Sequence, residues 1–231
     1  MISASERTFG VTAYCRICNI PIAVNTGDTD FLCPRCKGRR ISVIGGRAGW
    51  KIASHNFRLM YPNADIEFID TVELPKKMPE DEYFIGVGGN DQRKHIHKLL
   101  KDLLKKEPLN SIHPTALHEA CRLGHGNLLM PYSVINPDAT IGNCTIINTG
   151  AIIEHDVEIH DYAQISPNAT ISGYAIIKEG AFIGSGAVIL PGVVIGEWAV
   201  IGAGSTVTKE IKPNTTYAGC PRNPYKKRRK K

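Results

Sequence analysis

A repeat of six residues constrains the fold of this 231-residue chain more than any other feature. From residue 135 to residue 207 every sixth residue is aliphatic, and the residue two positions before each of them is small or a valine. A strict period of six fits neither the alternation of a β-strand nor the 3.6-residue turn of an α-helix. The aliphatic series is Ile135, Ile141, Ile147, Ile153, Ile159, Ile165, Ile171, Ile177, Ile183, Ile189, Ile195, Ile201 and Val207.

A parallel β-helix explains this period, because each side of a triangular coil takes about six residues and three sides return the chain over itself. One coil then holds about 18 residues, and residues that far apart in sequence lie about 4.8 Å apart in neighbouring coils. Both series then point inward. The units that begin at Ile183-Gly184 and Ile195-Gly196 resemble those of the hexapeptide-repeat acyltransferases, which implies a left-handed β-helix. A solenoid with a purely structural role is the alternative.

Residues 41–112 are expected to form a small Rossmann-like domain before the β-helix, which we assign to residues 113–212. Apolar stretches at 41–44, 66–69 and 83–87 predict the strands of a βαβαβ unit, with one helix ending near residue 60 and another from 91 to about 106. Ligands of such sheets bind where the carboxyl ends of the strands meet helix N-termini. The glycine pairs and the acid at that edge predict a nucleotide-sized ligand, although ordinary tight turns would also explain the glycines. These residues are Gly45, Gly46, Gly88, Gly89 and Asp70.

Two CxxC pairs near the N-terminus predict a zinc ribbon over residues 1–40. Four thiolates at this spacing, Cys15, Cys18, Cys33 and Cys36, suit a tetrahedral structural zinc site. A thioredoxin-type redox pair would leave the second CxxC unexplained. Basic residues near the second pair also allow a role in docking to nucleic acid or a partner, namely Arg35, Lys37, Arg39 and Arg40. The remaining cysteines are read as thiols outside any site.

The formal charge of +6 belongs to the C-terminal segment, residues 213–231. Its last eleven residues carry seven positive charges and no negative one, so the rest of the chain carries 6 − 7 = −1. We therefore expect a basic tail on a nearly neutral body, which makes nucleic acid an unlikely partner. No apolar run reaches the ~18 residues of a membrane span, and the first residues lack the apolar core of a signal peptide. A cytoplasmic location without a membrane span is expected.

One hexad carries a candidate catalytic pair. His155 can act as a base near neutral pH, and the carboxylate of Asp156 can stabilise its imidazolium form. Gly173 lies one coil further on, about 5 Å away, where its N–H could meet a developing oxyanion. This arrangement suits acyl transfer. A solvated histidine at a solenoid corner is the alternative.

Residues 41–220 resemble the NeuD/PglD family of nucleotide-sugar acetyltransferases. The motifs that carry the resemblance are Tyr83-Phe84-Ile85-Gly86-Val87-Gly88-Gly89-Asn90-Asp91-x-Arg93, Met130-Pro131-Tyr132-Ser133-Val134-Ile135-Asn136, and Asn148-Thr149 leading to Ile152-Ile153-Glu154-His155-Asp156. The resemblance implies a homotrimer that transfers acetyl from acetyl-CoA to the 4-amino group of a UDP-linked 4-amino-4,6-dideoxy sugar.

The resemblance also implies roles for individual residues. His155 corresponds to the general base, Asp156 to the carboxylate that supports it, and Asp70 to the acid that reads uracil. Substrate binding is assigned to Gly45, Gly46, Arg47, Asp70, Gly88, Gly89 and Asn148. Binding of acetyl-CoA is assigned to Gln164, Ser166, Gly173, Ser185 and Ala203, with the Gly173 amide at the thioester carbonyl.

The sequence departs from the family pattern at two of these positions. The first glycine turn lacks the usual histidine, so we expect phosphate contact to pass to Arg47, and Gln164 stands where a histidine is common. The expected mechanism is direct attack of the amine on the thioester, without an acyl-enzyme, because the CoA thiolate is a good leaving group.

Three other functions remain open from the sequence. They are sugar O-acetylation of the sialic-acid type, a metal site like that of the γ-class carbonic anhydrases, and a non-catalytic nucleic-acid adaptor. The metal site would use His155 and His160 and would need a third histidine, but all the others precede the regular hexads.

Overall fold

The computed structural model of the chain describes residues 11–14, 21–24, 39–74, 76, 79 and 81–220, with the backbone alone at 11–14, 21–24, 47, 48 and 50. Strands β1 (Val11–Tyr14) and β2 (Pro21–Val24) form an antiparallel pair. The predicted zinc ligands Cys15, Cys18, Cys33 and Cys36 lie outside the described residues, as does the basic tail from residue 221. The zinc ribbon therefore stays a prediction.

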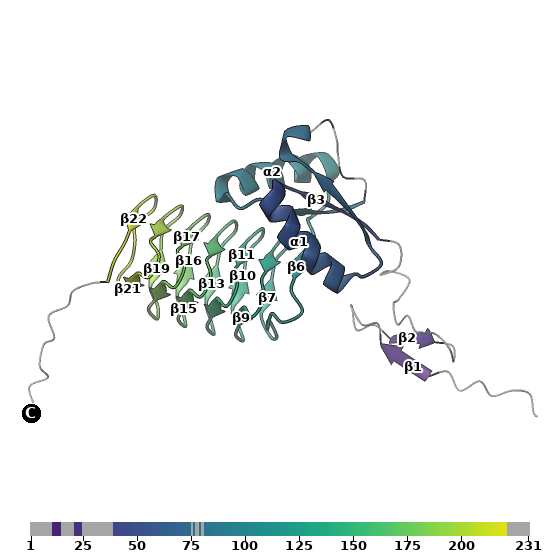
Figure 1. The fold of residues 1–231 in the computed structure, drawn as a ribbon. Helices are drawn as coiled ribbons and strands as arrows, with labels where there is room; N and C mark the ends of the chain where they lie inside the picture. The colour runs from purple at the N-terminus through teal and green to yellow at the C-terminus, as the bar shows by residue number, and fades with distance from the viewer. Residues whose placement is uncertain are drawn as a thin grey trace, which may run out of the picture.

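Residues 40–104 form what we call the βα unit (Figure 1). Its parallel sheet has β3 (Arg40–Ile44) in the centre, between β4 (Asp65–Ile69) and β5 (Glu82–Ile85). Helix α1 (Arg47–Met60) joins β3 to β4, and α2 (Asn90–Leu104) follows β5. The predicted sheet is confirmed. Between β4 and β5, however, the described residues form only a 3-10 turn, η1 (Thr71–Glu73), and not a helix.

The rest of the described chain is a parallel β-helix, which confirms the predicted fold (Figure 1). Each of its described strands is two residues long, and a full coil contributes one strand to each of three walls. The strands are β6 (Ser111–Ile112), β7 (Arg122–Leu123), β8 (Leu128–Leu129), β9 (Val134–Ile135), β10 (Thr140–Ile141), β11 (Ile146–Ile147), β12 (Ile152–Ile153), β13 (Glu158–Ile159), β14 (Gln164–Ile165), β15 (Thr170–Ile171), β16 (Ile176–Ile177), β17 (Phe182–Ile183), β18 (Val188–Ile189), β19 (Val194–Ile195), β20 (Val200–Ile201), β21 (Thr206–Val207) and β22 (Thr216–Tyr217).

We number the three walls in the order in which the chain visits them. The first wall holds β6, β8, β11, β14, β17, β20 and β22, the second β9, β12, β15, β18 and β21, and the third β7, β10, β13, β16 and β19. An edge is the set of turns between two walls. The pairing Ile141↔Ile159 shows that residues 18 apart stack in adjacent coils, as the sequence predicts.

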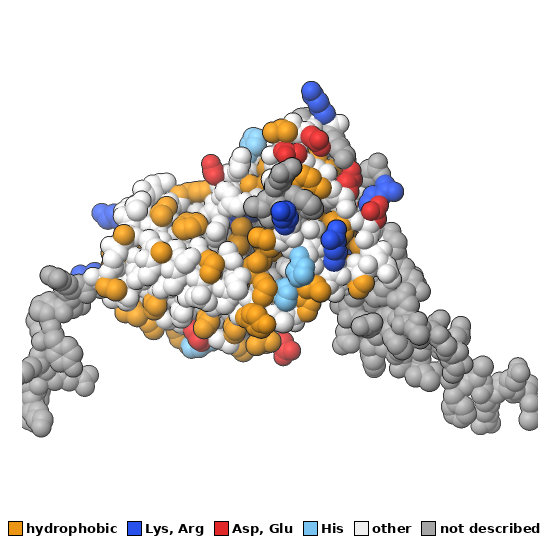
Figure 2. Space-filling view, viewed as in Figure 1, with side chains coloured by type: hydrophobic (Ala, Val, Ile, Leu, Met, Phe, Trp, Pro, Cys, Tyr) orange, Lys and Arg blue, Asp and Glu red, His pale blue; other side chains and the backbone are white. Residues whose placement is uncertain are grey.

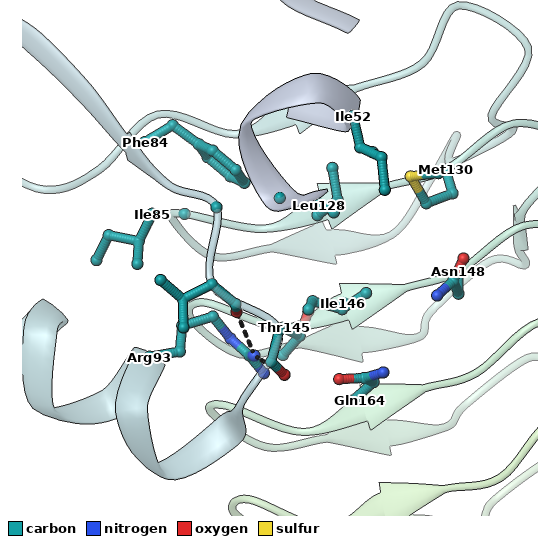
Figure 3. A pocket seen from close by; sticks show the side chains of 15 residues that line it. Ile52, Phe84, Ile85, Arg93, Leu128, Met130, Thr145, Ile146, Asn148 and Gln164 are labelled. Atoms are coloured by element: carbon teal, nitrogen blue, oxygen red, sulfur yellow. Dashed lines mark hydrogen bonds between the residues drawn. The ribbon is translucent and has the colours of Figure 1, made fainter. Parts of the chain in front are cut away.

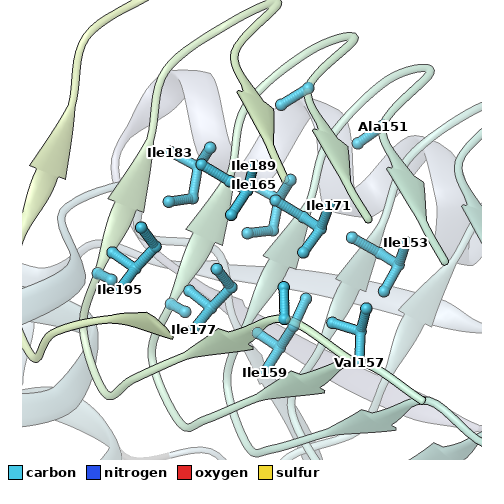
Figure 4. Close-up of a cluster of buried hydrophobic side chains, with 14 of the residues drawn as sticks. Ala151, Ile153, Val157, Ile159, Ile165, Ile171, Ile177, Ile183, Ile189 and Ile195 are labelled. Atoms are coloured by element: carbon cyan, nitrogen blue, oxygen red, sulfur yellow. The ribbon is translucent and has the colours of Figure 1, made fainter. Parts of the chain in front are cut away.

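The two inward series of the repeat form the core of the β-helix. The isoleucines meet along its axis (Figure 4), and all of them are buried, most of them completely. The smaller series is buried as well. Every sixth residue, in the turns, has a positive φ, and Asp156 is one of them (φ 57°). The period of six therefore reflects one turn per wall in addition to one core side chain per wall.

The regular coils begin earlier than the isoleucine series suggests. Leu129 and Leu123 occupy the two preceding aliphatic positions, in β8 and β7, and Leu117 bridges to Val134. At the other end, Ile201 pairs with Tyr217 rather than with residue 219, so the last coil is shorter. These first coils have leucine in place of isoleucine, and they lie within the residues 113–212 that the sequence analysis assigns to the β-helix.

The βα unit packs on one side of the β-helix. Phe57 and Phe84 share a buried cluster with Leu128 and Ile146, whose side chains point outward from the first wall. Helix α2 lies along the edge between the third and first walls, where it contacts the turns at Cys144 and Tyr162. In Figure 2 charged side chains gather over the βα unit, whereas the visible side of the β-helix is mostly uncharged.

Candidate functional site

The predicted catalytic pair is formed in the structure. His155 Nδ1 lies 2.8 Å from Asp156 Oδ2, in the turn between β12 and β13. The positive φ of Asp156 turns its carboxylate back onto the preceding side chain. Because Nδ1–H donates to the carboxylate in one tautomer, Nε2 is left free to accept a proton. Both side chains are about half exposed, so a substrate can reach them.

Gly173 lies next to the histidine ring, as the spacing of 18 predicts. A Cβ built on Gly173 would lie 3.0 Å from both Nε2 and Cε1 of His155. Among the described residues, the Gly173 N–H has no hydrogen-bond partner. The Gly173 N–H and the free Nε2 of His155 therefore lie side by side. This arrangement suits stabilisation of an oxyanion beside a general base.

Tyr174 also lies beside His155, although the sequence analysis did not single it out. Its ring meets that of His155 edge to face with centroids 5.3 Å apart, and 62% of the residue is exposed. Tyr174 follows Asp156 by 18 residues, just as Gly173 follows His155 by 18 residues. The available signal in the sequence was an aromatic residue one coil beyond the predicted pair.

The predicted substrate residues of the βα unit lie at the carboxyl edge of its sheet. Gly46 and Gly89 are the N-caps of α1 and α2, and a Cβ on Gly46 or Gly88 would meet open space. Gly45 differs, because it is buried and packs against the carbonyl group of Gly86. Its small size thus serves close packing inside the unit rather than the approach of a ligand.

Asp70 and Arg47 were also assigned to the substrate. Asp70 follows β4, and its Oδ1 accepts a hydrogen bond from the backbone N–H of Val72 at 3.1 Å, which caps η1. Its other carboxylate oxygen has no hydrogen bond within the described residues. Arg47 begins α1, and its side chain is not among those described.

A cavity of about 200 Å³ lies between the βα unit and the first wall (Figure 3). Its lining is mostly apolar, with Ile52 and Phe84 on one side and Leu128 and Ile146 on the other. Asn148 and Gln164 contribute amide groups from the β-helix side, and Gly88 and Arg93 from the βα unit complete the lining. The cavity therefore joins a predicted substrate turn to residues predicted for substrate and CoA.

One chain does not bring all the predicted site residues together. Gly173 and the pair His155–Asp156 lie on the edge between the second and third walls. The other predicted residues of the β-helix lie on or beside the edge between the first and second walls: Asn148, Ser166, Ser185 and Ala203 in its turns, and Gln164 on β14. In a three-sided coil, the edge that carries His155 lies opposite the first wall, where the βα unit and the cavity are found.

The residues predicted for CoA differ in exposure. Ser185 and Ala203 are exposed, and Gln164 is half-buried. Ser166 is buried, and its hydroxyl has no hydrogen-bond partner among the described residues. In a single chain, little of Ser166 is therefore accessible to a cofactor.

His160, the second histidine of the alternative metal site, lies near Glu158 and Lys178 and not near His155. Its Nε2 is 3.7 Å from Glu158 Oε2 and 3.4 Å from Lys178 Nζ. Within the part of the chain that the structure describes, no group of three or more His, Cys, Asp or Glu residues could hold a metal ion.

Among the described residues, no helix is both long and apolar enough to cross a membrane.

The chain is similar to known transferases both in sequence and in fold. The model of the bacterial transferase hexapeptide family (six repeats) matches residues 139–173 and 174–209. A mutant of perosamine N-acetyltransferase from Caulobacter crescentus, solved with CoA and GDP-perosamine, is 27% identical with a TM-score of 0.70, over 78% of this chain and 93% of that chain. The acetyltransferase domain of PglB from Neisseria gonorrhoeae, solved with acetyl coenzyme A, is 26% identical with a TM-score of 0.72, over 79% of this chain and 97% of that chain.

WeeI from Acinetobacter baumannii has the same fold, with a TM-score of 0.68 at 24% identity over 78% of this chain and 97% of that chain. The similarities span both the βα unit and the β-helix, because the matched share exceeds the β-helix alone. The chain therefore has the hexapeptide-transferase fold and matches CoA-dependent N-acetyltransferases of amino sugars.

Proposed function

We propose that this protein transfers the acetyl group of acetyl-CoA to the 4-amino group of a nucleotide-linked 4-amino-4,6-dideoxy sugar, with UDP as the expected nucleotide. The observation that carries the proposal is the free Nε2 of His155 beside the unpaired Gly173 amide, on a hexapeptide β-helix. The match to enzymes solved with CoA and a nucleotide amino sugar supports the substrate class.

The mechanism needs one base and one amide donor. The neutral amine attacks the carbonyl carbon of the thioester while His155 Nε2 accepts its proton, and Asp156 holds the imidazolium ion. The oxygen that becomes negative is stabilised by the Gly173 N–H. The C–N bond then remains, the C–S bond breaks, and the CoA thiolate leaves and takes up a proton. An alkyl thiol such as that of CoA has a pKa of about 8.5, so its thiolate is a good leaving group. The amine can therefore displace it directly, and no acyl-enzyme is required.

The nucleotide sugar is proposed to bind at the carboxyl edge of the βα sheet. The open backbone at Gly46 and Gly88 and the first turns of the two long helices suit a diphosphate. The free carboxylate oxygen of Asp70 is the proposed acceptor for a base N–H. The mostly apolar cavity, which Asn148 helps to line, suits a deoxy sugar, because such a sugar presents a methyl group beside polar groups.

A homotrimer is proposed because the two halves of the site lie on different edges of one chain. Both edges border the second wall, whose outward side chains carry no charge: Val134, Ile152, Thr170, Val188 and Thr206. If these walls face a threefold axis, His155 of one copy meets the edge with Asn148 and Ser185 of the next. Cyclic assembly thus completes the site and covers an uncharged face.

The test is an acetyl-CoA turnover screen against UDP-, dTDP-, GDP- and CMP-linked sugars, with wild-type protein and His155→Ala. We expect turnover with a nucleotide 4-amino sugar and a fall in kcat of ~100-fold or more in the variant. His160→Ala is the matched control, since it removes a histidine five residues away that makes no contact with the pair. Unchanged turnover in His155→Ala would overturn the mechanism, and a response to CMP-sialic acid alone would point to O-acetylation.

A further inference from the structure

Arg93, on α2, is the largest fully buried side chain of the described residues. Only 1% of it is exposed, and burial lowers the pKa of its guanidinium group to about 10. Its hydrogen bonds go to four backbone carbonyls and one amide oxygen, with no carboxylate among them. They are Nε to Cys144 O (2.7 Å), Nη1 to Val87 O (3.0 Å) and Gly88 O (3.1 Å), and Nη2 to Asn90 Oδ1 (3.0 Å) and Tyr162 O (2.8 Å).

These acceptors belong to two different parts of the molecule. Val87 and Gly88 form the turn between β5 and α2, and both carbonyls accept hydrogen bonds from Arg93, which is labelled in Figure 3. Cys144 and Tyr162 occupy stacked turns on the edge between the third and first walls. One rigid guanidinium group therefore fixes the position of the β5–α2 turn along the axis of the β-helix.

The same hydrogen bonds set the direction of the peptide groups in this turn. In a trans peptide the C=O and the following N–H point in opposite directions. Because the carbonyls of Val87 and Gly88 are held toward Arg93, the N–H groups of Gly88 and Gly89 point away from it. Neither N–H has a hydrogen-bond partner among the described residues, and a Cβ on Gly88 would meet open space.

Other contacts hold α2 itself in place without touching this turn's backbone. Asn90 Nδ2 donates to Gly180 O at 3.1 Å, Lys94 forms an ion pair with Glu179, and His97 Nδ1 lies 2.9 Å from the Tyr162 hydroxyl. The helix is thus anchored to the β-helix by several side chains. Among the residues that the structure describes, only Arg93 also donates to the carbonyls of Val87 and Gly88.

We propose that Arg93 is a positioning residue for the nucleotide sugar. By holding the β5–α2 turn at one position along the β-helix, it orients the N–H groups of Gly88 and Gly89 toward the diphosphate. This inference rests on the proposed function. It assigns to a buried arginine a role in substrate affinity rather than in the chemistry at His155, which lies on another edge.

The test compares Arg93→Lys with Lys94→Met, which breaks the neighbouring ion pair and leaves the turn alone. Lysine keeps the charge but cannot bridge both sets of carbonyls. We expect KM for the nucleotide sugar to rise at least about tenfold in Arg93→Lys, because buried acceptors lose their donors, while KM for acetyl-CoA changes less than about twofold. Lys94→Met should leave both KM values near those of the wild type.

Equal changes in both KM values, or a lower kcat with an unchanged KM for the sugar, would overturn the role. If Arg93→Lys does not fold, Asn90→Ala takes its place. It removes one guanidinium acceptor, and the inference requires KM for the nucleotide sugar alone to rise. Calorimetric binding of UDP and GDP separates the two proposals: weaker binding to Arg93→Lys supports the role of Arg93 even if no acetyl transfer is found, and equal binding contradicts it.

Discussion

At the scale of single residues, the candidate site depends on a glycine that leaves room for a histidine. Gly173 is buried against the ring of His155, and any side chain there would crowd Nε2, the atom proposed to accept the proton. Its φ lies outside the left-handed region, so alanine can adopt the same backbone. The absence of a side chain at this position therefore serves the site and not the turn.

Gly173→Ala should reduce kcat by roughly tenfold or more, because a shift of a few tenths of an ångström misaligns the base and the amide donor. The unfolding temperature should stay close to that of the wild type. Gly192→Ala gives the opposite pattern. Gly192 has a φ of 70° with open space around it, so alanine there should cost about 1–2 kcal/mol of stability and leave kcat unchanged. Equal kcat in wild type and Gly173→Ala would contradict this account of the site.

At the scale of elements, two-residue strands are too short to be stable by themselves. Each coil is held by the side chains that stack on its neighbours along the axis (Figure 4). In β13 the two residues have separate tasks: Ile159 is 1% exposed in the core, and Glu158 points outward. Comparison of the two isolates the contribution of the core position.

Ile159→Ala should lower the free energy of unfolding by about 2–5 kcal/mol, the usual cost of such a truncation in a packed core. Glu158→Ala, in the same strand, should change it by less than about 0.5 kcal/mol. Chemical denaturation followed by circular dichroism measures both. A small effect of Ile159→Ala would show that the coils are not packed as described.

At the scale of the whole molecule, the site is divided between two edges of the prism. The βα unit covers the first wall, and His155 lies on the edge opposite to that wall. In a single copy the proposed base, His155, therefore lies away from the cavity proposed for the sugar. The proposed trimer resolves this division.

Co-expression of His155→Ala with Asn148→Ala tests this arrangement. Each variant alone should lose most of its activity. In random mixed trimers about one quarter of the interfaces combine an intact His155 with an intact Asn148 from the next copy, so activity should recover toward a quarter of the wild-type value. Sedimentation analysis should give three chains per particle. Activity that stays at the level of the single variants would place both residues in the same copy.

The β-helix, its core and the contact of His155 with Asp156 all follow from the order of residues along the chain. A period of six is a local pattern that needs no long-range information, and stacking at 18 residues then converts positions in the chain into neighbours in space, as for His155 and Gly173. The contacts of the non-repetitive part are visible only in the folded molecule. Gly45 packs against Gly86, Asp70 caps η1, and Arg93 joins α2 to the β-helix, because these contacts arise where two differently built units meet and no periodicity records them.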